Sequence, residues 1–325
     1  MLKKMVFLGT GGTIAGTAAE VNDNVGYTAA QLGVGELLAA LPGLQQALGG
    51  LAFFAEQVAQ VDSKDMGWTQ WRELAVRVQH HLVQPDVASI VITHGTDTLE
   101  ETAFFLSRVL PQKWLAQKAV VLTCAMRPAS SLAPDGPQNV LDAVAVAQSY
   151  LARGVLAVCA GTVHCARDVQ KVHPYRLDAF DSGDAGPLAY VQEGRVRWLH
   201  ACPVADMGDQ FFPVEALSRD AWPRVEIILS YAGAMGDTVR ALCAKPVDSA
   251  HVVRGIVVAG TGNGTIHQHL NTALREAQAQ GVRVLRSTRC AYGRVVAGTA
   301  AGEFADAQGL SPVKARIALM LELMA

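Results

Sequence analysis

The sequence has few charged residues and no strong excess of either sign. Charged residues make up 17% of the 325 positions, and the formal net charge is −2. A protein that binds the phosphates of nucleic acid needs a basic face, and no long run of lysine or arginine supplies one. Half of the residues are apolar, which is typical of a well-buried globular enzyme and not of a disordered or fibrous chain. We therefore expect no nucleic-acid partner.

Long apolar runs are also missing. The run at the N-terminus, Met5–Leu8, ends at Gly9, whereas a secretory signal needs about 7–15 apolar residues. No stretch reaches the roughly 20 apolar residues that a membrane-spanning helix requires. These absences predict a cytoplasmic protein that has no membrane partner.

The cysteines lack the spacing of a metal site. There are six of them, scattered along the chain without a C-x-x-C pair. The nearest approach to a ligand pair is His164-Cys165, whose adjacent side chains would point apart on a strand. Scattered cysteines in a chain of this length are typical of small core residues in a reducing compartment. We expect no metal ion.

Short β-branched runs alternate with longer helical patterns along the chain. Continuous apolar runs such as Ile90–Ile92 and Ile256–Val258 are typical of strands covered on both faces. The alternation predicts parallel βαβ units and an α/β fold. The predicted strands are Met5–Leu8, Ala88–Ile92, Ala119–Leu122, Val155–Ala160, Val225–Leu229, Gly255–Ala259 and Val282–Arg286. The predicted helices are Trp68–Leu82, Leu99–Leu110, Val140–Leu151, Asp237–Ala244 and Ile266–Gln280.

The length of the chain predicts two domains, because a single hydrophobic core usually stops growing below this size. From Tyr190 to about Trp222 the strand and helix patterns weaken and prolines accumulate, as in a linker between domains. We therefore predict an N-terminal catalytic α/β domain at 1–195, a linker at 196–222 and a C-terminal α/β domain at 223–325.

Three predicted strands are each followed by a turn rich in glycine and threonine: Gly9–Gly16, Thr93–Thr98 and Gly260–Thr265. Ligands of open α/β sheets bind at the carboxyl ends of the strands, and the N–H groups of such turns can hold an anion or an oxyanion. The first turn matches a dinucleotide-binding fingerprint only in part, because Ile14 stands at its last glycine position and Thr17–Gly26 has no helical pattern. We expect no cofactor.

Polar residues near these turns have ordinary structural explanations when each is taken alone. Thr96 and Asp97 precede a predicted helix, and such residues often cap a first turn. A single lysine such as Lys171 is most often a solvated surface residue. Ser63 and Tyr27 are residue types common in turns and at loop ends. No single residue therefore identifies a site.

The combination of motifs resembles the bacterial-type L-asparaginase family. Its two most specific stretches are Thr10–Gly16, which reads TGGTIAG, and Ile92–Thr102, which reads ITHGTDTLEET. The other matching stretches are collinear with them and extend the resemblance over nearly the whole chain: Val61–Met66, Ala125–Ala129, Pro134–Pro137, Ala166–Lys171, Gly260–Gly264 and Ser311–Arg316. The resemblance implies a larger N-terminal α/β domain with a mostly parallel sheet and a smaller flavodoxin-like C-terminal α/β domain.

The resemblance also implies the activity and a role for the matching residues. The expected reaction is hydrolysis of L-asparagine to L-aspartate and ammonia. Thr13 matches a threonine nucleophile on a mobile loop, and Tyr27 matches the tyrosine that helps to activate it. Thr96, Asp97 and Lys171 match a second, more rigid catalytic triad. The family self-associates, so we expect a homodimer or homotetramer in which a neighbour's C-terminal domain completes each site.

Substrate-binding residues are implied in the same way. Ser63 and Asp97 match residues that hold the α-carboxylate and the α-amino group of the substrate. Thr265 matches a small polar residue that borders the neighbouring subunit's site. The full expected set is Asp62, Ser63, Lys64, Thr96, Asp97 and Thr265.

The chemistry of these residue types agrees with the implied roles. A threonine hydroxyl is a weak nucleophile and needs a nearby proton acceptor. A lysine that is partly removed from water can accept the proton, with Asp97 orienting it. Attack on an amide creates an oxyanion, which turn N–H groups at Gly12 or Gly95 can stabilise. An acyl-enzyme would then form with release of ammonia, and water would release aspartate from it.

One departure from the family pattern lies in the expected substrate pocket. Relatives usually have glutamine or serine at the position of Lys64. A lysine there can pair with the α-carboxylate of the substrate, but it repels the α-ammonium group. Alternatively, its stem packs and its charge points to solvent. We favour a role in the substrate site.

A second departure lies between Tyr292 and Gly309. The family often has a glutamate in this stretch that reaches the loop tyrosine of a neighbouring subunit. In this chain Arg294–Gly302 contains no acid, and Glu303 aligns poorly. The pair of Thr13 and Tyr27 therefore lacks an identified acidic partner.

Three other functions fit parts of the pattern. A mixed glutaminase-asparaginase is the nearest, because one extra methylene changes selectivity by only about 1–3 kcal/mol. An amidotransferase subunit that supplies ammonia to mischarged glutamyl-tRNA normally has an additional N-terminal domain, whereas this chain starts at its first predicted strand. A non-enzymatic amino-acid sensor would be expected to lack Thr96, Asp97 or Lys171, and all three are present.

Overall fold

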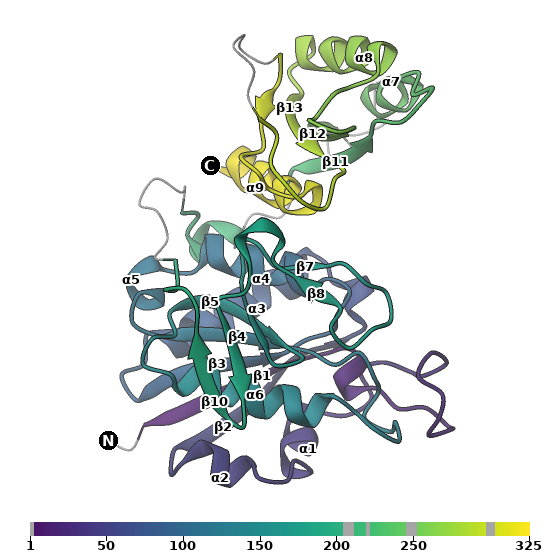
Figure 1. Cartoon of the computed structure of the whole chain (residues 1–325). Helices are drawn as coiled ribbons and strands as arrows, with labels where there is room; N and C mark the ends of the chain where they lie inside the picture. Colours follow the sequence, from purple (N-terminus) through teal and green to yellow (C-terminus); the bar gives the residue numbers. More distant parts are fainter. Residues whose placement is uncertain (1–2, 204–210, 219–221, 245–251, 297–302) are drawn as a thin grey trace. The chain divides into compact units, whose positions relative to one another are not determined.

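The chain divides into two compact units, Met1–Ser218 and Arg219–Ala325, each built around its own main sheet (Figure 1). The structure is a computed structural model, and it describes residues 3–203, 211–218, 222–244, 252–296 and 303–325. The division lies inside the segment 196–222 that we expected as a linker. Strand β10 (Arg195–Trp198) and the 3-10 helix η4 (Val214–Ser218) of that segment belong to the first unit.

The first unit contains an eight-stranded, mostly parallel sheet. Its strands are β1 (Lys4–Gly11), β2 (Ala52–Val61), β3 (Val87–Thr93), β4 (Ala119–Thr123), β5 (Gly154–Cys159), β6 (Thr162–Cys165), β9 (Ala189–Gln192) and β10. Their order is β10-β9-β6-β5-β4-β3-β1-β2, and the five strands from β5 to β2 are parallel. A separate antiparallel pair, β7 (Gln170–Lys171) and β8 (Phe180–Asp181), lies outside this sheet.

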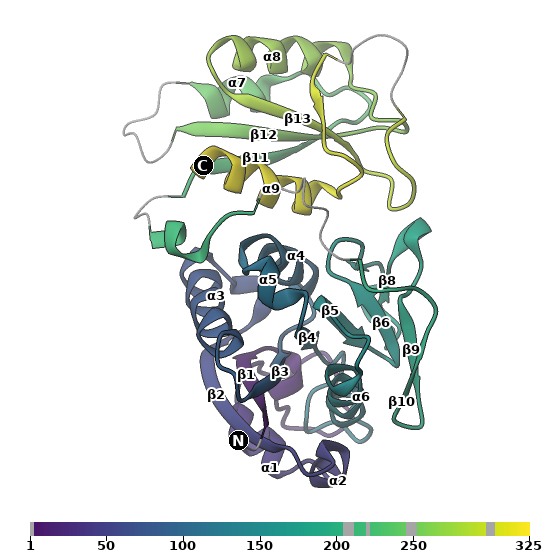
Figure 2. The same cartoon turned by 90° about the vertical axis from the view of Figure 1, so that its left-hand side faces the viewer.

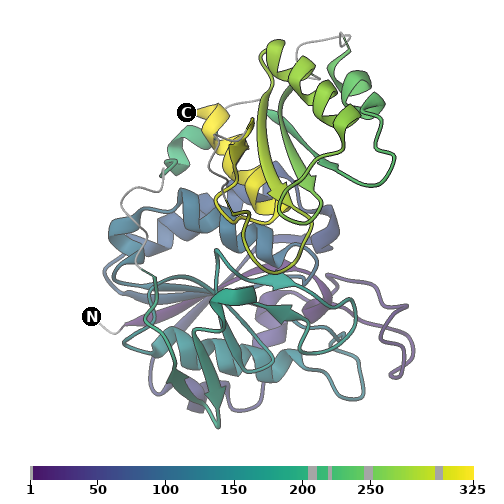
Figure 3. The ribbon, with the colours of Figure 1, turned by 45° about the horizontal axis from the view of Figure 1, so that its top comes forward.

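Two helix layers cover the sheet (Figure 3). One layer contains α1 (Val34–Ala39), α2 (Leu44–Leu48) and α6 (Gly136–Gln148); the other contains α3 (Trp68–Leu82), α4 (Leu99–Val109) and α5 (Gln112–Leu115). Met5 and Phe7 of β1 pack against the first layer, and the alternate residues Val6 and Leu8 are also fully buried. Burial on both faces explains the continuous apolar runs in these strands.

The second unit has a four-stranded parallel sheet with the order β11-β12-β13-β14. Its elements are β11 (Arg224–Leu229), α7 (Asp237–Cys243), β12 (Val253–Gly260), α8 (Gln268–Ala279), β13 (Arg283–Thr288), β14 (Ala305–Asp306) and α9 (Pro312–Met324). Helices α7 and α8 share one core with Ile256 and Val258, and α9 covers the opposite face (Figure 2). Gly255 makes room for α9, because a Cβ there would lie 2.7 Å from the side chain of Leu319.

The predicted α/β class is confirmed, with a larger, mostly parallel unit and a smaller parallel one. Every predicted strand and helix is present with small shifts at its ends. Among the described strands and α-helices, those without a prediction are β2, β14, the antiparallel strands β6 to β9 and the helices α1, α2, α5 and α9. Among the described helices, none is long and apolar enough to span a bilayer.

Candidate active site

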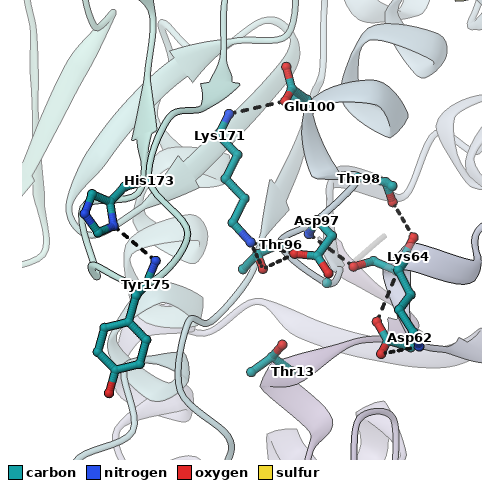
Figure 4. A network of polar contacts seen from close by, with 12 residues as sticks. Thr13, Asp62, Lys64, Thr96, Asp97, Thr98, Glu100, Lys171, His173 and Tyr175 are labelled. Atoms are coloured by element: carbon teal, nitrogen blue, oxygen red, sulfur yellow. Dashed lines mark hydrogen bonds and ion pairs between the residues drawn. The ribbon is translucent and has the colours of Figure 1, made fainter. Parts of the chain in front are cut away.

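Three turns meet at the carboxyl ends of β1, β2 and β3, which are neighbours in the first sheet. The 3-10 helix η1 (Thr13–Ala15) follows β1, and η2 (Ser63–Asp65) follows β2. The turn that carries Thr96 follows β3. Because parallel strands end at the same edge of a sheet, this topology gathers side chains that lie far apart in the sequence. Figure 4 shows the resulting polar cluster.

Two glycines allow these turns to pack backbone against backbone. A Cβ on Gly12 would lie 2.3 Å from Cα of Gly95, and a Cβ on Gly95 would lie 2.4 Å from Oγ of Ser63. Gly12 also has a φ of +83°, a conformation that other residue types rarely adopt. The two glycines therefore set the distance between the turn of Thr13 and the turn of Thr96.

Thr96, Asp97 and Lys171 form one connected group. Nζ of Lys171 donates hydrogen bonds to Oγ1 of Thr96 at 2.8 Å and to Oδ1 of Asp97 at 2.6 Å. The side chain of Lys171 is 16% exposed and that of Asp97 is 52% exposed, so the lysine is the more desolvated partner. The backbone N–H of Lys171 donates to Glu100 of α4 at 3.3 Å. The lysine of β7 is thus fixed to the helix that follows the threonine turn (Figure 4).

A buried series of hydrogen bonds supports the backbone of the turn that carries Thr96. Trp71 of α3 donates through Nε1 to Oγ1 of Thr102 at 2.9 Å. The same hydroxyl lies 2.9 Å from Nε2 of His94, whose Nδ1 lies 2.7 Å from the carbonyl oxygen of Gly95. Burial lowers the pKa of His94 to about 4, so the ring is neutral and has one N–H. That N–H must be on Nδ1 to serve the carbonyl, and the Thr102 hydroxyl then donates to Nε2.

Ser63 joins the turn after β2 to the turn after β3. Its buried Oγ accepts the N–H of Asp97 at 3.2 Å, and its carbonyl oxygen accepts the hydroxyl of Thr98 at 2.8 Å. Both bonds cross between turns, so Ser63 orients the backbone that presents Asp97.

Lys64 is paired with the carboxylates of its own turn. Nζ lies 2.8 Å from Oδ2 of Asp62 and 2.9 Å from Oδ2 of Asp65. These hydrogen bonds, that of Asp62 first, raise the pKa of Lys64. The lysine side chain is 61% exposed, so its charge is both neutralised and solvated. Its two carboxylates are therefore partly occupied before any ligand binds.

Thr13 and Tyr27 form a separate pair. Their hydroxyl oxygens lie 2.6 Å apart. Burial, followed by the carboxylates of Asp62 and Asp97, raises the pKa of Tyr27 against the opposing effect of the Thr13 bond. Tyr27 is therefore a neutral phenol at neutral pH. Its ring lies against Gly16, where a Cβ would stand 2.8 Å from Cδ2 of the ring.

The predicted site residues of the first unit are thus arranged in two groups, one around Thr96 and one around Thr13. Thr265, also expected at the site, belongs to the second unit, where its hydroxyl lies 2.8 Å from that of Thr261. Glu303 binds Nδ2 of Asn271 at 2.7 Å and also pairs with Arg275. Positions 297–302 of the acid-free stretch lie outside the described residues.

Two features of the site differ from or add to the prediction. Of the two expected oxyanion donors, Gly12 already donates its N–H to the carbonyl oxygen of Val61 at 3.0 Å, which leaves Gly95. The supporting chain through His94, Thr102 and Trp71 had no prediction. Its one visible signal was a histidine between a buried strand and a glycine turn.

The arrangement has the components of nucleophilic acyl transfer: a hydroxyl, a lysine within hydrogen-bonding distance and a carboxylate that orients the lysine. Over the described residues, no group of three or more His, Cys, Asp and Glu side chains is placed to hold a metal ion.

Comparisons with known proteins agree over the whole chain. Residues 4–203 match the family profile "Asparaginase, N-terminal", and residues 224–325 match "Glutaminase/Asparaginase C-terminal domain". The glutaminase-asparaginase of Pseudomonas fluorescens biotype A is 36% identical over 99% of this chain and 86% of the relative. L-asparaginase 2 of Escherichia coli strain K12 is 35% identical over 99% and 89%. The crystal structure of a probable cytoplasmic L-asparaginase from Campylobacter jejuni matches with a TM-score of 0.88 at 35% identity, over 99% of this chain and 95% of that chain.

Proposed function

The chain belongs to the asparaginase family, and we propose that this amidohydrolase converts L-asparagine to L-aspartate and ammonia. The observation that carries the proposal is the Thr96 group, in which one lysine nitrogen lies 2.8 Å from a threonine hydroxyl and 2.6 Å from a carboxylate. A general base that must be oriented and must become charged during the reaction needs both contacts.

Thr13 is the proposed nucleophile. Its Oγ1 attacks the amide carbon of the substrate and gives its proton to the oxygen of Tyr27, 2.6 Å away. Because Tyr27 is a neutral phenol, it can pass its own proton to the departing nitrogen, so ammonia leaves and the acyl-threonine forms. This relay balances without an additional acid. The N–H of Gly95 is the proposed donor to the oxyanion.

We propose that the second step uses Thr96, Asp97 and Lys171. They remove a proton from water, which is the nucleophile of this step. The side-chain nitrogen of Lys171 accepts a proton through the hydroxyl of Thr96, from water that attacks the acyl-threonine. The ammonium group that then forms lies 2.6 Å from the Asp97 carboxylate, which stabilises it. Lys171 returns this proton through the hydroxyl of Thr96 to Oγ1 of Thr13 as the acyl bond breaks, so aspartate is released and the enzyme is restored.

The substrate head group is proposed to bind between the turns after β2 and β3. Asp97 and Asp62 supply negative charge for the α-ammonium group. Ser63 presents a hydroxyl that is buried before the substrate arrives, and Thr265 borders a neighbouring subunit's site. Lys64 reduces the negative charge that this pocket offers to the α-ammonium group, because its own ammonium group pairs with Asp62.

Glutamine is the second candidate substrate, and two named relatives favour it. Those of Pseudomonas fluorescens and Acinetobacter glutaminasificans are glutaminase-asparaginases, 36% and 34% identical to this chain. We further propose a homodimer or homotetramer and a cytoplasmic location. The Campylobacter jejuni protein is described as probably cytoplasmic, whereas a Haemophilus influenzae relative, 34% identical, is named a probable periplasmic L-asparaginase.

Coupled detection of ammonia tests the proposal. Purified protein is given L-asparagine, L-glutamine and D-asparagine separately, and kcat/KM is measured for each. Release from L-asparagine well above the rate without enzyme is expected. No release from any of the three amides would overturn the proposal, and binding of an amino acid without ammonia would favour the sensor instead.

A further inference from the structure

A second segment of the first unit holds the loop that carries Tyr27. We call residues 16–28 the lid segment and residues 126–135 the anchor segment. Three hydrogen bonds join them: the N–H of Ala129 to the carbonyl oxygen of Gly16 at 2.9 Å, the N–H of Leu132 to that of Val21 at 3.0 Å, and the N–H of Ala18 to Oγ of Ser130 at 2.8 Å. Only the third uses a side chain, so Ser130 is the contact that a substitution can remove cleanly.

The anchor segment is itself held firmly. The carboxylate of Asp135 accepts the N–H groups of Met126 and Arg127, each at 2.9 Å, and Nδ2 of Asn139 at 3.2 Å. Nη1 of Arg127 also donates to the carbonyl oxygen of Ala133 at 3.0 Å. The anchor segment is therefore braced where it leaves β4 and where it enters α6. It can act as a fixed support for a less stable neighbour.

The lid segment has little internal packing to hold it in place. Its apolar side chains Val21 and Val25 are 53% and 76% exposed. Its internal bonds are the bridge between Thr17 and Thr28, the bond from the N–H of Asp23 to the carbonyl oxygen of Glu20, and two N–H groups that the Asp23 carboxylate caps. Segments with few buried contacts open with a small free energy. The three bonds to the anchor segment are thus a large part of what keeps the lid segment closed.

We propose that Ser130 is a positioning residue, which holds the lid segment closed so that the hydroxyl of Tyr27 stays beside that of Thr13. Ala18 is close to Tyr27 because their chain neighbours, Thr17 and Thr28, form a bridge that joins the two ends of the lid segment. Loss of one neutral hydrogen bond changes such a closing equilibrium by roughly 3- to 10-fold. The catalytic part of this inference rests on the proposed function, whereas its effect on lid order does not.

The test compares Ser130→Ala with Ser130→Thr, which keeps the acceptor, and with Ser131→Ala, which leaves the lid bond intact. Hydrogen exchange is measured on peptides that contain the amide of Ala18, and kcat/KM is measured for L-asparagine. For Ser130→Ala we expect exchange to accelerate roughly 3- to 10-fold and kcat/KM to fall by a similar factor. Ser130→Thr should restore both values, and Ser131→Ala should match the parent protein in both.

The outcomes separate the two proposals. Unchanged exchange in Ser130→Ala overturns the inference whatever the activity. Faster exchange with unchanged kcat/KM shows that the bond orders the lid segment but does not position Tyr27, which also overturns it. If the parent protein releases no ammonia while Ser130→Ala exchanges faster, the proposed function fails and the closing role of Ser130 stands. A general loss of folding would appear as faster exchange in α6 as well, and Ser130→Thr would not show it.

Discussion

The turns of Thr96 and Thr13 lie side by side, yet they are held in different ways. The turn of Thr96 is held by hydrogen bonds to His94, Ser63 and Lys171. The hydroxyl of Thr13 instead meets Tyr27, which arrives on the lid segment. One threonine is positioned by the rigid sheet and its helices, whereas the other depends on a loop whose closure can vary.

This difference suggests that the two turns have different functions in the reaction. A group that must orient a charged lysine gains from a site that does not move, because a fixed dipole or charge costs no reorganisation during the reaction. A group that must close over a substrate has to open again to release the product. Under the proposed mechanism, Thr96 on its firmly held turn and Thr13, whose partner Tyr27 lies on the lid segment, serve different requirements of one cycle.

The largest expected effect comes from removing either hydroxyl. We expect Thr96→Ala and Thr13→Ala each to lower kcat for L-asparagine about a thousandfold or more, because each removes a hydroxyl that we propose as a nucleophile or a proton-transfer group. Steady-state ammonia release gives kcat, and circular dichroism checks the fold. Thr272→Ala, at an exposed position of α8, is the matched control and should keep full activity. Retention of more than about a tenth of the parent kcat by Thr96→Ala would contradict its role.

The contact between the two turns gives the next prediction. Gly12→Ala combines a left-handed φ with a Cβ 2.3 Å from Cα of Gly95, so the turns must separate. We expect a loss of roughly 2–4 kcal/mol in stability together with loss of activity. Gly43→Ala has a similar φ of +78° but no atom within 4 Å of the new Cβ. Thermal unfolding and kcat of the two variants separate the strain of φ from the clash, and equal effects would refute the importance of the contact.

The support that His94 gives to the turn of Thr96 can be tested by varying the pH. His94 has its folded pKa lowered to about 4 from 6.5 by burial, so the unfolded chain binds the extra proton first as pH falls. The stability of the first unit should therefore decline from about pH 6.5 to about pH 4, by up to about 3 kcal/mol from this group. His94→Asn should remove that part of the slope in denaturant titrations, while His80→Gln, at an exposed position of α3, should retain it. Identical slopes in parent and His94→Asn would contradict this account.

The two turns also differ in how far the sequence predicts them. Strand ends, glycines and the ITHGTDT motif indicate where Thr13 and Thr96 lie, because these are local patterns. The chain from Trp71 through Thr102 to His94 is tertiary: its members belong to α3, α4 and the turn, and no local pattern pairs them. Strand β2 is not predicted because it lies at the sheet edge, with Phe53 and Phe54 37% and 45% exposed, and because Glu56 and Gln57 end the apolar run that begins it.

Helix α9 is not predicted from the sequence for a different reason. Its first residue, Pro312, follows Ser311 at the N-cap position, and this pair is a recognisable start signal in the sequence. Its residues are apolar on most sides and buried, so an amphipathic pattern was absent. The signal at the helix start was therefore available, while the periodicity that usually supports it was not.

The smallest predicted effect concerns the charge of Lys64, on the turn that follows β2. Lys64 shares Asp62 with the proposed pocket for the substrate α-ammonium group. Lys64→Gln should free that carboxylate and lower KM for L-asparagine by roughly 2- to 5-fold, a modest change because exposed ion pairs are screened. Succinamate, which has the amide and the carboxylate but no α-ammonium group, should show no such gain. Lys113→Gln, at an exposed position of α5, is the control for a lost surface charge.

The direction of this change decides between the two interpretations of Lys64. If Lys64 instead binds the α-carboxylate, Lys64→Gln raises KM for L-asparagine and for succinamate alike, because both have that carboxylate. A fall for asparagine alone places the effect at the α-ammonium group. Tyr27 provides a further check, since the Lys64 charge lowers its pKa while Asp62 raises it. Removing Lys64 therefore raises the phenol pKa further and leaves Tyr27 neutral, so kcat should change little while KM moves.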